Sequence, residues 1–186
     1  GEQMRLRGEP EKAIDYYQQA LEVTRKISAK NSEVMISSNL GGAKILLGEF
    51  SDAENTLRKV FELVGDREHF ILPETHRFLA EALYGQGKFE EALKTGKESL
   101  KLSEAAENNE NIACAWRAIA NILAATKESA TINGINYTAE DCFDNAIDIF
   151  EKSGMKAEYA RTLRDFASTA DDPKASEMLT NASTIF

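Results

Sequence analysis

Cysteine, proline and glycine are all scarce in this chain, whose 186 residues include 2, 3 and 11 of them. The two cysteines, Cys114 and Cys142, stand far apart and have no metal-ligand spacing around them. This excludes a disulfide framework and a cysteine-bound metal, and we expect reduced thiols. So few prolines and glycines argue against a loop-rich domain, whereas 42% hydrophobic residues are enough to build an ordered one.

Long apolar runs are also missing from the sequence. No stretch approaches the roughly 20 apolar residues that span a bilayer. The N-terminus lacks the basic segment followed by an apolar stretch that marks a secretory signal. We therefore expect no membrane segment and a cytoplasmic location.

Positive charge is in the minority, with 22 Lys and Arg against 31 Asp and Glu and a formal net charge of -9. A surface of this sign repels the phosphates of nucleic acids and the headgroups of anionic lipids. The composition therefore predicts neither a nucleic-acid partner nor a membrane partner.

An internal repeat dominates what the sequence does contain. A turn motif that begins with Gly and ends in Ala starts at Gly8 and recurs at Gly48 and Gly87, 40 and then 39 residues later. The copies read Gly8-Glu-Pro-Glu-Lys-Ala13, Gly48-Glu-Phe-Ser-Asp-Ala53 and Gly87-Lys-Phe-Glu-Glu-Ala92. An apolar residue followed by a small one has the same period, at Leu40-Gly41, Leu79-Ala80 and Ile119-Ala120. Two features with one period predict a repeat architecture.

Each repeat unit reads as two antiparallel helices, because helical periodicity is sustained and strand-like alternation is almost absent. The first helix carries the apolar–small pair, and the turn motif opens the second helix. Small side chains let two helices cross closely, which larger ones would prevent. We therefore expect the small residues of the first helices to face those of the second helices: Gly41, Ala80 and Ala120 against Ala53, Ala92 and Ala139. The predicted fold class is all-α.

The fourth unit carries the most specific pattern. On its first helix, apolar and small residues fall at i, i+3, i+4 and i+7, and its second helix has a small–aromatic–small series. These residues are Trp116, Ile119, Ala120 and Leu123, followed by Ala139, Phe143 and Ala146. The pattern resembles the tetratricopeptide repeat family. The resemblance implies a right-handed superhelical stack of antiparallel helix pairs, an α-solenoid, and a period near 40 resembles its long-repeat subgroup in Pins-like scaffolds and bacterial signalling proteins.

The repeats can be laid out over the whole chain as one domain, residues 1–186. About five units are expected, with the first truncated, so we expect a fragment of a longer protein. Their approximate bounds are residues 1–30, 31–68, 71–107, 109–153 and 155–186.

Prolines and insertions refine this layout. Pro10, Pro73 and Pro173 all fall at expected helix starts, where the missing N–H costs nothing. The fourth unit carries an insertion, Lys127 to Asn136, with a turn at Asn133-Gly134, and we expect a mobile loop there.

The family resemblance implies a concave groove, lined by the first helices, that takes extended peptides. A residue two positions before the apolar–small pair points about 200° around the helix, away from the core and toward that groove. Arg77, Arg117 and Arg161 occupy these positions. Asn39, just before Leu40, is expected to hydrogen-bond a peptide backbone. The alternative is that these arginines are solvated or paired with neighbouring glutamates.

The residue four positions after each arginine predicts whether the arginine forms an ion pair within its own helix. Glu81 follows Arg77 and Asp165 follows Arg161, so each pair can form along one helix turn. Arg117 is followed by Asn121 instead, which predicts an unneutralised cation beside an amide. Such a pair suits a carboxylate, from an acidic side chain or a C-terminus of a partner. It also resembles the Lys–Asn pairing of chaperone-binding family members.

Catalytic, metal-binding and cofactor-binding chemistry is not predicted. His69 and His76 are the only histidines, and no metal spacing surrounds them. Asp141, Asp144 and Asp148 form an acidic helical stripe that is more typical of a solvated face than of a metal site.

Three functions remain open at this stage. The first is a protein–protein interaction scaffold that binds a peptide segment of a partner in the groove. The second is a sensory or regulatory module of a larger bacterial signalling protein, which binds an intracellular peptide or its own effector domain. The third is self-association, with the chain as a homo-oligomer.

Overall fold

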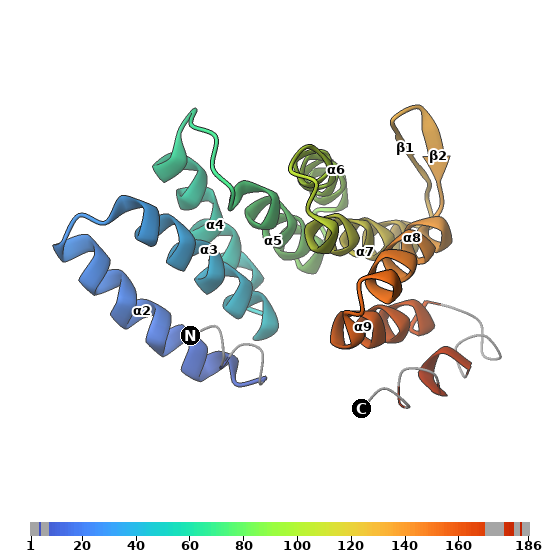
Figure 1. Cartoon of the computed structure of the whole chain (residues 1–186), viewed down its shortest axis with the longest axis horizontal. Helices are drawn as coiled ribbons and strands as arrows, with labels where there is room; N and C mark the ends of the chain where they lie inside the picture. The colour runs from blue at the N-terminus through green and yellow to red at the C-terminus, as the bar shows by residue number, and fades with distance from the viewer. Residues whose placement is uncertain (1–3, 5–7, 170–176, 181–182, 184–186) are drawn as a thin grey trace. The chain divides into compact units, whose positions relative to one another are not determined.

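The computed structural model describes residue 4, residues 8–169, residues 177–180 and residue 183. Successive helices run antiparallel in pairs, and the only strands in the described part form one short hairpin (Figure 1). The helices are α2 (Pro10–Lys26), α3 (Lys30–Leu46), α4 (Phe50–Val64), α5 (Leu72–Gly85), α6 (Phe89–Ala105), α7 (Asn109–Thr126), α8 (Ala139–Lys152) and α9 (Lys156–Ala167). The strands are β1 (Ala130–Ile132) and β2 (Ile135–Tyr137). The predicted helical class is confirmed.

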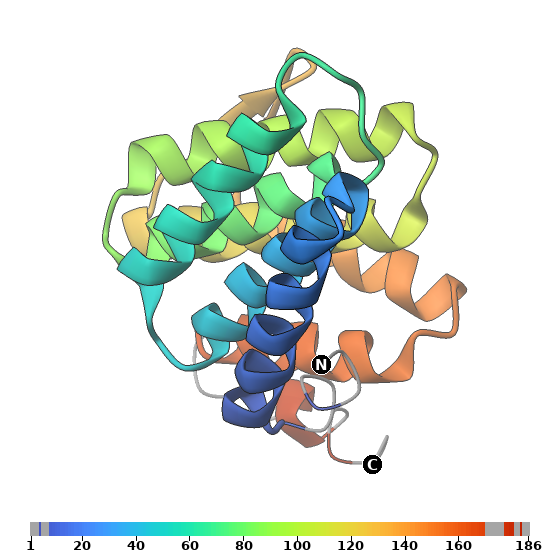
Figure 2. The ribbon, with the colours of Figure 1, turned by 90° about the vertical axis from the view of Figure 1, so that its left-hand side faces the viewer.

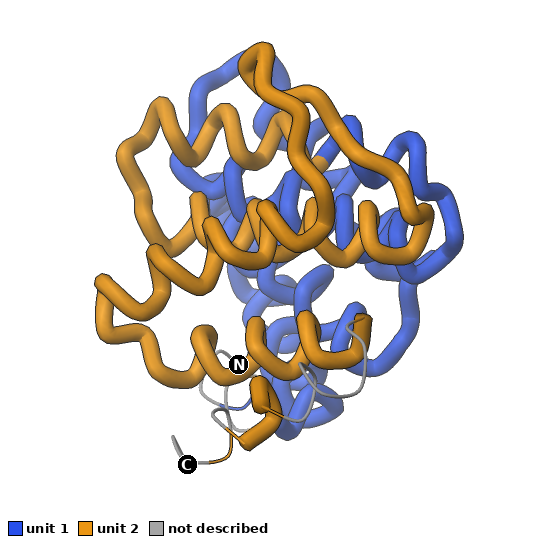
Figure 3. Tube along the Cα trace, turned by 90° about the vertical axis from the view of Figure 1, so that its right-hand side faces the viewer, with its two compact units in different colours: residues 1–95 blue, residues 96–186 orange. Residues whose placement is uncertain are grey.

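The chain divides into two compact units, residues 1–95 and residues 96–186 (Figure 3). The dividing point falls inside helix α6. That the whole chain acts as one domain stays a prediction, as do the bounds of the repeats.

Helix starts in unit 1 follow the turn chemistry of the sequence. Gly48 and Gly87 adopt left-handed backbone angles, with φ of 76° and 74°, just before α4 and α6. A side chain is disfavoured in that region, so glycine is the residue that ends one helix and lets the next begin. Pro10 is the first residue of α2, and Pro73 lies at the start of α5, as predicted. Pro173 lies outside the described residues.

Close helix packing in unit 1 depends on small residues. A Cβ atom added to Gly41 would lie 2.5 Å from Cδ2 of Leu57, and one added to Gly42 would lie 2.6 Å from Cζ of Phe78. These distances are far below van der Waals contact, so α3 approaches α4 and α5 only because both positions lack a side chain. Gly41 thus meets a leucine, where we expected an alanine.

Alanines at the other repeat positions are fully buried, namely Ala53, Ala80, Ala92 and Ala120. Ala139 is half-buried.

The core of unit 1 comes from the buried faces of its helices. Ala13, Tyr17 and Leu21 recur every four residues along α2 and pack against α3. Figure 2 shows unit 1 with α2 nearest the viewer. Ser38 of α3 and Thr75 of α5 share a buried hydrogen bond of 2.8 Å between their hydroxyls. These contacts align α2, α3 and α5.

A buried carboxylate joins the two helix pairs of unit 1. Glu54 of α4 accepts hydrogen bonds from Lys88 and Gln86, both at 2.7 Å, and pairs with Arg58 at 2.8 Å. Arg58 also reaches Glu91 of α6 at 2.6 Å. Burial alone would raise the pKa of Glu54, but the bonds from Lys88, Gln86 and Arg58 outweigh it and lower the pKa to about 2.

Unit 2 is built from α7, α8 and α9 around aromatic side chains. Phe143 and Phe150 of α8 are fully buried, and the rings of Phe143 and Phe166 stack with centroids 4.7 Å apart. The predicted inward stripe of α7 is confirmed, since Trp116, Ile119, Ala120 and Leu123 are all buried.

The predicted mobile loop at Lys127 to Asn136 is wrong, because this segment forms the β1–β2 hairpin. Asn133 and Gly134 have φ of 50° and 81°, which suits the tight two-residue connection between paired strands. Tyr137 packs its ring 4.9 Å from that of Trp116, and Lys97 donates to the Thr131 carbonyl. The turn signal in the sequence therefore marked a folded hairpin.

Candidate protein-binding surfaces

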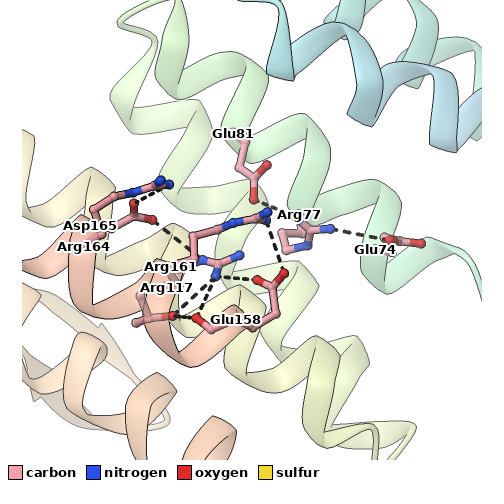
Figure 4. A network of polar contacts seen from close by, with 9 residues as sticks. Glu74, Arg77, Glu81, Arg117, Glu158, Arg161, Arg164 and Asp165 are labelled. Atoms are coloured by element: carbon pink, nitrogen blue, oxygen red, sulfur yellow. Dashed lines mark hydrogen bonds and ion pairs between the residues drawn. The ribbon is translucent and has the colours of Figure 1, made fainter. Parts of the chain in front are cut away.

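Arg77 of α5 lies in unit 1 and is buried, with only 9% of its side chain exposed. It forms an ion pair with Glu81 at 2.6 Å, as predicted, and a longer one with Glu74 at 3.5 Å (Figure 4). Its guanidinium also lies 4.1 Å from the centroid of the Phe78 ring. Arg77 therefore braces its own helix, and little of it is available to a ligand.

Arg117 of α7 does not carry the free charge that the sequence predicted. Its Nη1 lies 2.6 Å from Oε2 of Glu158 in α9, and only 6% of its side chain is exposed. The same nitrogen reaches the hydroxyl of Thr162 at 3.4 Å, and Nε lies 3.9 Å from Asp165 (Figure 4). Glu158 follows Arg117 by 41 residues. The spacing of residues along one helix therefore could not predict this ion pair.

Asn121 belongs to the same network in unit 2. Its side chain helps to lower the pKa of Asp165, the carboxylate that we expected to neutralise Arg161. Burial raises the pKa of Asp165, although Arg117, Arg164 and the Asn121 side chain act against that shift. Arg117 of the predicted Arg117–Asn121 pair therefore holds carboxylates of its own chain, and it links α7 to α9.

Arg161 is the most accessible of the three predicted arginines. Its side chain is 43% exposed and pairs with Glu158 at 3.3 Å instead of with Asp165. Arg164, one turn further along α9, is 68% exposed and lies 3.9 Å from Asp165. Asn39 of α3, in unit 1, is half-buried. Arg117, Asn121 and Arg161 are thus brought together within unit 2.

Unit 1 holds an open groove that sequence reasoning missed. Helix α3 forms its floor and α2 and α4 form its walls, and the groove has a volume of about 640 Å³. Leu21, Ser37 and Leu40 line its base, while Glu22 and Lys59 lie on opposite walls. Its lining residues come from three helices, so no pattern along a single helix indicates it.

Other candidate chemistry has a structural role. His76 packs its ring 4.6 Å from that of Phe61, and Asp141 caps the start of α8. Asp148 pairs with Lys152 on the exposed face of α8. Within the described residues, no three His, Cys, Asp or Glu side chains gather to hold a metal ion. None of the described helices is long and apolar enough to cross a membrane.

Both cysteines are buried thiols that take no part in a disulfide. Burial, together with the charge of Asp141, raises the pKa of Cys142 to about 12, so this thiol stays protonated.

Comparison with known proteins finds a family match for the first part of the chain and a shared fold for nearly all of it. Residues 1–64 match the family described as tetratricopeptide repeat. No curated protein matches the chain. The crystal structure of BtubC (BKLC) from P. vanneervenii is similar, with 18% identity and a TM-score of 0.68 over 95% of this chain and 73% of that one.

A putative kinesin light chain from Podosopora anserina, with nearly identical TPR-like repeats, is also similar. Its crystal structure has 15% identity and a TM-score of 0.57 over 99% of this chain and 90% of that one. A variant of it gives a TM-score of 0.58. At these identities the likeness concerns the fold. Residues 1–64 thus match the tetratricopeptide repeat family by sequence, and nearly the whole chain shares the fold of these repeat structures.

Proposed function

We propose that this chain is a protein–protein interaction scaffold that binds a peptide segment of a partner on the faces of its first helices. Tetratricopeptide repeats generally mediate protein–protein interaction. The observation that carries the proposal is the fold. It is a series of helix pairs whose small residues are buried where the helices pack against one another. Packing in this way leaves the outer helix faces free for a ligand.

The contact that we propose for an acidic side chain or carboxylate of the partner is Arg161. It has the exposure that Arg77 and Arg117 lack, and its pairing with Glu158 is long enough to be exchanged for a ligand carboxylate. Asn39 is proposed as a contact to the peptide backbone in unit 1. Arg77, Arg117 and Asn121 then serve as supports that hold the first helices in place.

Selection of random peptides on the immobilised chain tests this function. We expect acidic sequences to be enriched and to bind Arg161→Glu about tenfold more weakly, because the substitution replaces attraction by repulsion. Lys152→Glu is the matched control, since it makes the same charge change on the exposed face of α8 in the same unit. Far-UV circular dichroism confirms that both variants are folded. Selected peptides that bind Arg161→Glu and wild type equally would remove Arg161 from the proposed site.

A further inference from the structure

The groove between α2 and α4 in unit 1 has the layout of a binding site. Its walls are second helices of their pairs, and neither Asn39 nor Arg161 is among its lining residues. Its volume of about 640 Å³ falls in the range of about 300–1,000 Å³ that is typical of ligand pockets.

The floor of the groove combines two leucines with Ser37 and Glu33. Leu21 and Leu40 are each 6% exposed, and Ser37 between them adds a small side chain that leaves room above it. Leu63, half-buried, continues this surface at the end of α4. An inserted apolar side chain would cover the remaining exposed parts of these leucines.

The rims of the groove carry charge, with carboxylates on both sides. Arg25 is already bound to Glu33 at 2.8 Å and is therefore neutralised. Glu22 on α2, with Lys59 and Glu62 on α4, are exposed and form no ion pair with the described part of the chain. Two free carboxylates thus face one free ammonium group, and the rims favour a cationic ligand.

We infer that this groove binds a short extended segment of another protein, with one or two large apolar side chains flanked on both sides by Lys or Arg. The apolar side chains lie on Leu21 and Leu40. The flanking cations meet Glu22 on one wall and Glu62 on the other.

Fluorescence anisotropy with three synthetic peptides tests the chemistry of the ligand. The first has a Leu-Phe core with two lysines on each side, the second has glutamates in place of the lysines, and the third has serines in place of the core. We expect the full chain to bind the first peptide, and to bind the other two about tenfold more weakly or not at all. Absence of binding to the first peptide, or equal binding to the glutamate peptide, overturns the proposal.

Variants locate the site. Glu22→Lys with Glu62→Lys should weaken binding of the lysine peptide about tenfold and strengthen that of the glutamate peptide. Glu104→Lys with Glu151→Lys is the matched control, because both residues are exposed and lie in unit 2. An equal loss in the control would mean that net charge alone attracts the peptide, and would overturn the proposal. Arg161→Glu should leave this binding unchanged, so failure here is distinct from failure of the first-helix site.

Discussion

Each unit uses a buried charge to join one helix pair to the next, but the sign of the charge differs. In unit 1 the central group is the carboxylate of Glu54, which collects Lys88, Gln86 and Arg58 around it. In unit 2 it is the guanidinium of Arg117, which collects carboxylates from α9. A charged residue that the sequence places on an exposed helix face can therefore be buried in an ion pair that joins one repeat to the next.

The two networks also differ in how completely their partners are buried. Lys88 and Arg58 remain 46% and 44% exposed, whereas Glu158 and Asp165 are 21% and 26% exposed. Water can therefore replace the partners of Glu54 more readily than those of Arg117. We expect the network of unit 2 to be the more costly one to break.

Arg117→Glu should give the largest effect. It places a carboxylate beside Glu158 and Asp165 in a buried site, at an expected cost of about 3–5 kcal/mol. Thermal unfolding should show a decrease in Tm on the order of 10 °C. Arg161→Glu on α9 is the control and should change Tm far less. A melting curve for Arg117→Glu that overlays the wild type would show that the network contributes nothing to stability.

Glu54→Gln should destabilise by about 2–3 kcal/mol at neutral pH, because it removes charge-assisted hydrogen bonds whose donors are half exposed. The pKa of Glu54 is lowered from 4.5 to about 2 in the folded state, so the ionised group stabilises the fold above pH 4.5. That contribution is lost as pH falls from 4.5 toward 2. Urea unfolding at several pH values should show the difference in free energy of unfolding between wild type and variant decreasing over this range. A difference that stays constant would contradict the stabilising role of ionised Glu54.

Gly41→Val tests the close approach of α3 to α4, which joins helices through small residues instead of charges. The new side chain would meet Leu57, and we expect a loss of about 1–2 kcal/mol after allowing for the better helix propensity of valine. Gly41→Ala should be milder, because Leu57 can shift to admit one methyl group. Chemical denaturation of both variants measures the change in free energy of unfolding. A Gly41→Val variant as stable as wild type would mean that the α3–α4 interface can accommodate a larger side chain.

Thr138→Ala should have the smallest effect, at about 1 kcal/mol. Thr138 and Asp141 form a reciprocal capping box at the start of α8, and the bonds from the Thr138 backbone and hydroxyl lower the pKa of Asp141. NMR titration should show the pKa of Asp141 rising in the variant. An unchanged pKa would indicate that the Thr138 hydroxyl does not donate a hydrogen bond to the Asp141 carboxylate.

Much of the fold could be predicted because its signals are local or periodic. The turn glycines, the buried alanines and the inward stripe of α7 each depend on neighbours a few residues away or on a spacing near 40. The hairpin was missed because Asn133-Gly134 marks a turn without saying whether the flanking residues pair. Ala130 and Ile132 are buried there by contacts that no local pattern reveals.

The candidate sites were less predictable. Local spacing correctly paired Arg77 with Glu81, but it paired Arg161 with the wrong carboxylate and left Arg117 free. The groove of unit 1 takes its residues from three helices, which no single helix pattern can combine.

By itself, the sequence determined the helix pairs, their small packing residues and the resemblance to tetratricopeptide repeats, because these rest on helical periodicity and on a regular repeat. Only the tertiary structure decided which charged side chains are buried in ion pairs within the protein and which are exposed at its surface. Burial and pairing depend on the distance between groups in space, and Arg117 meets a carboxylate that lies 41 residues away along the chain.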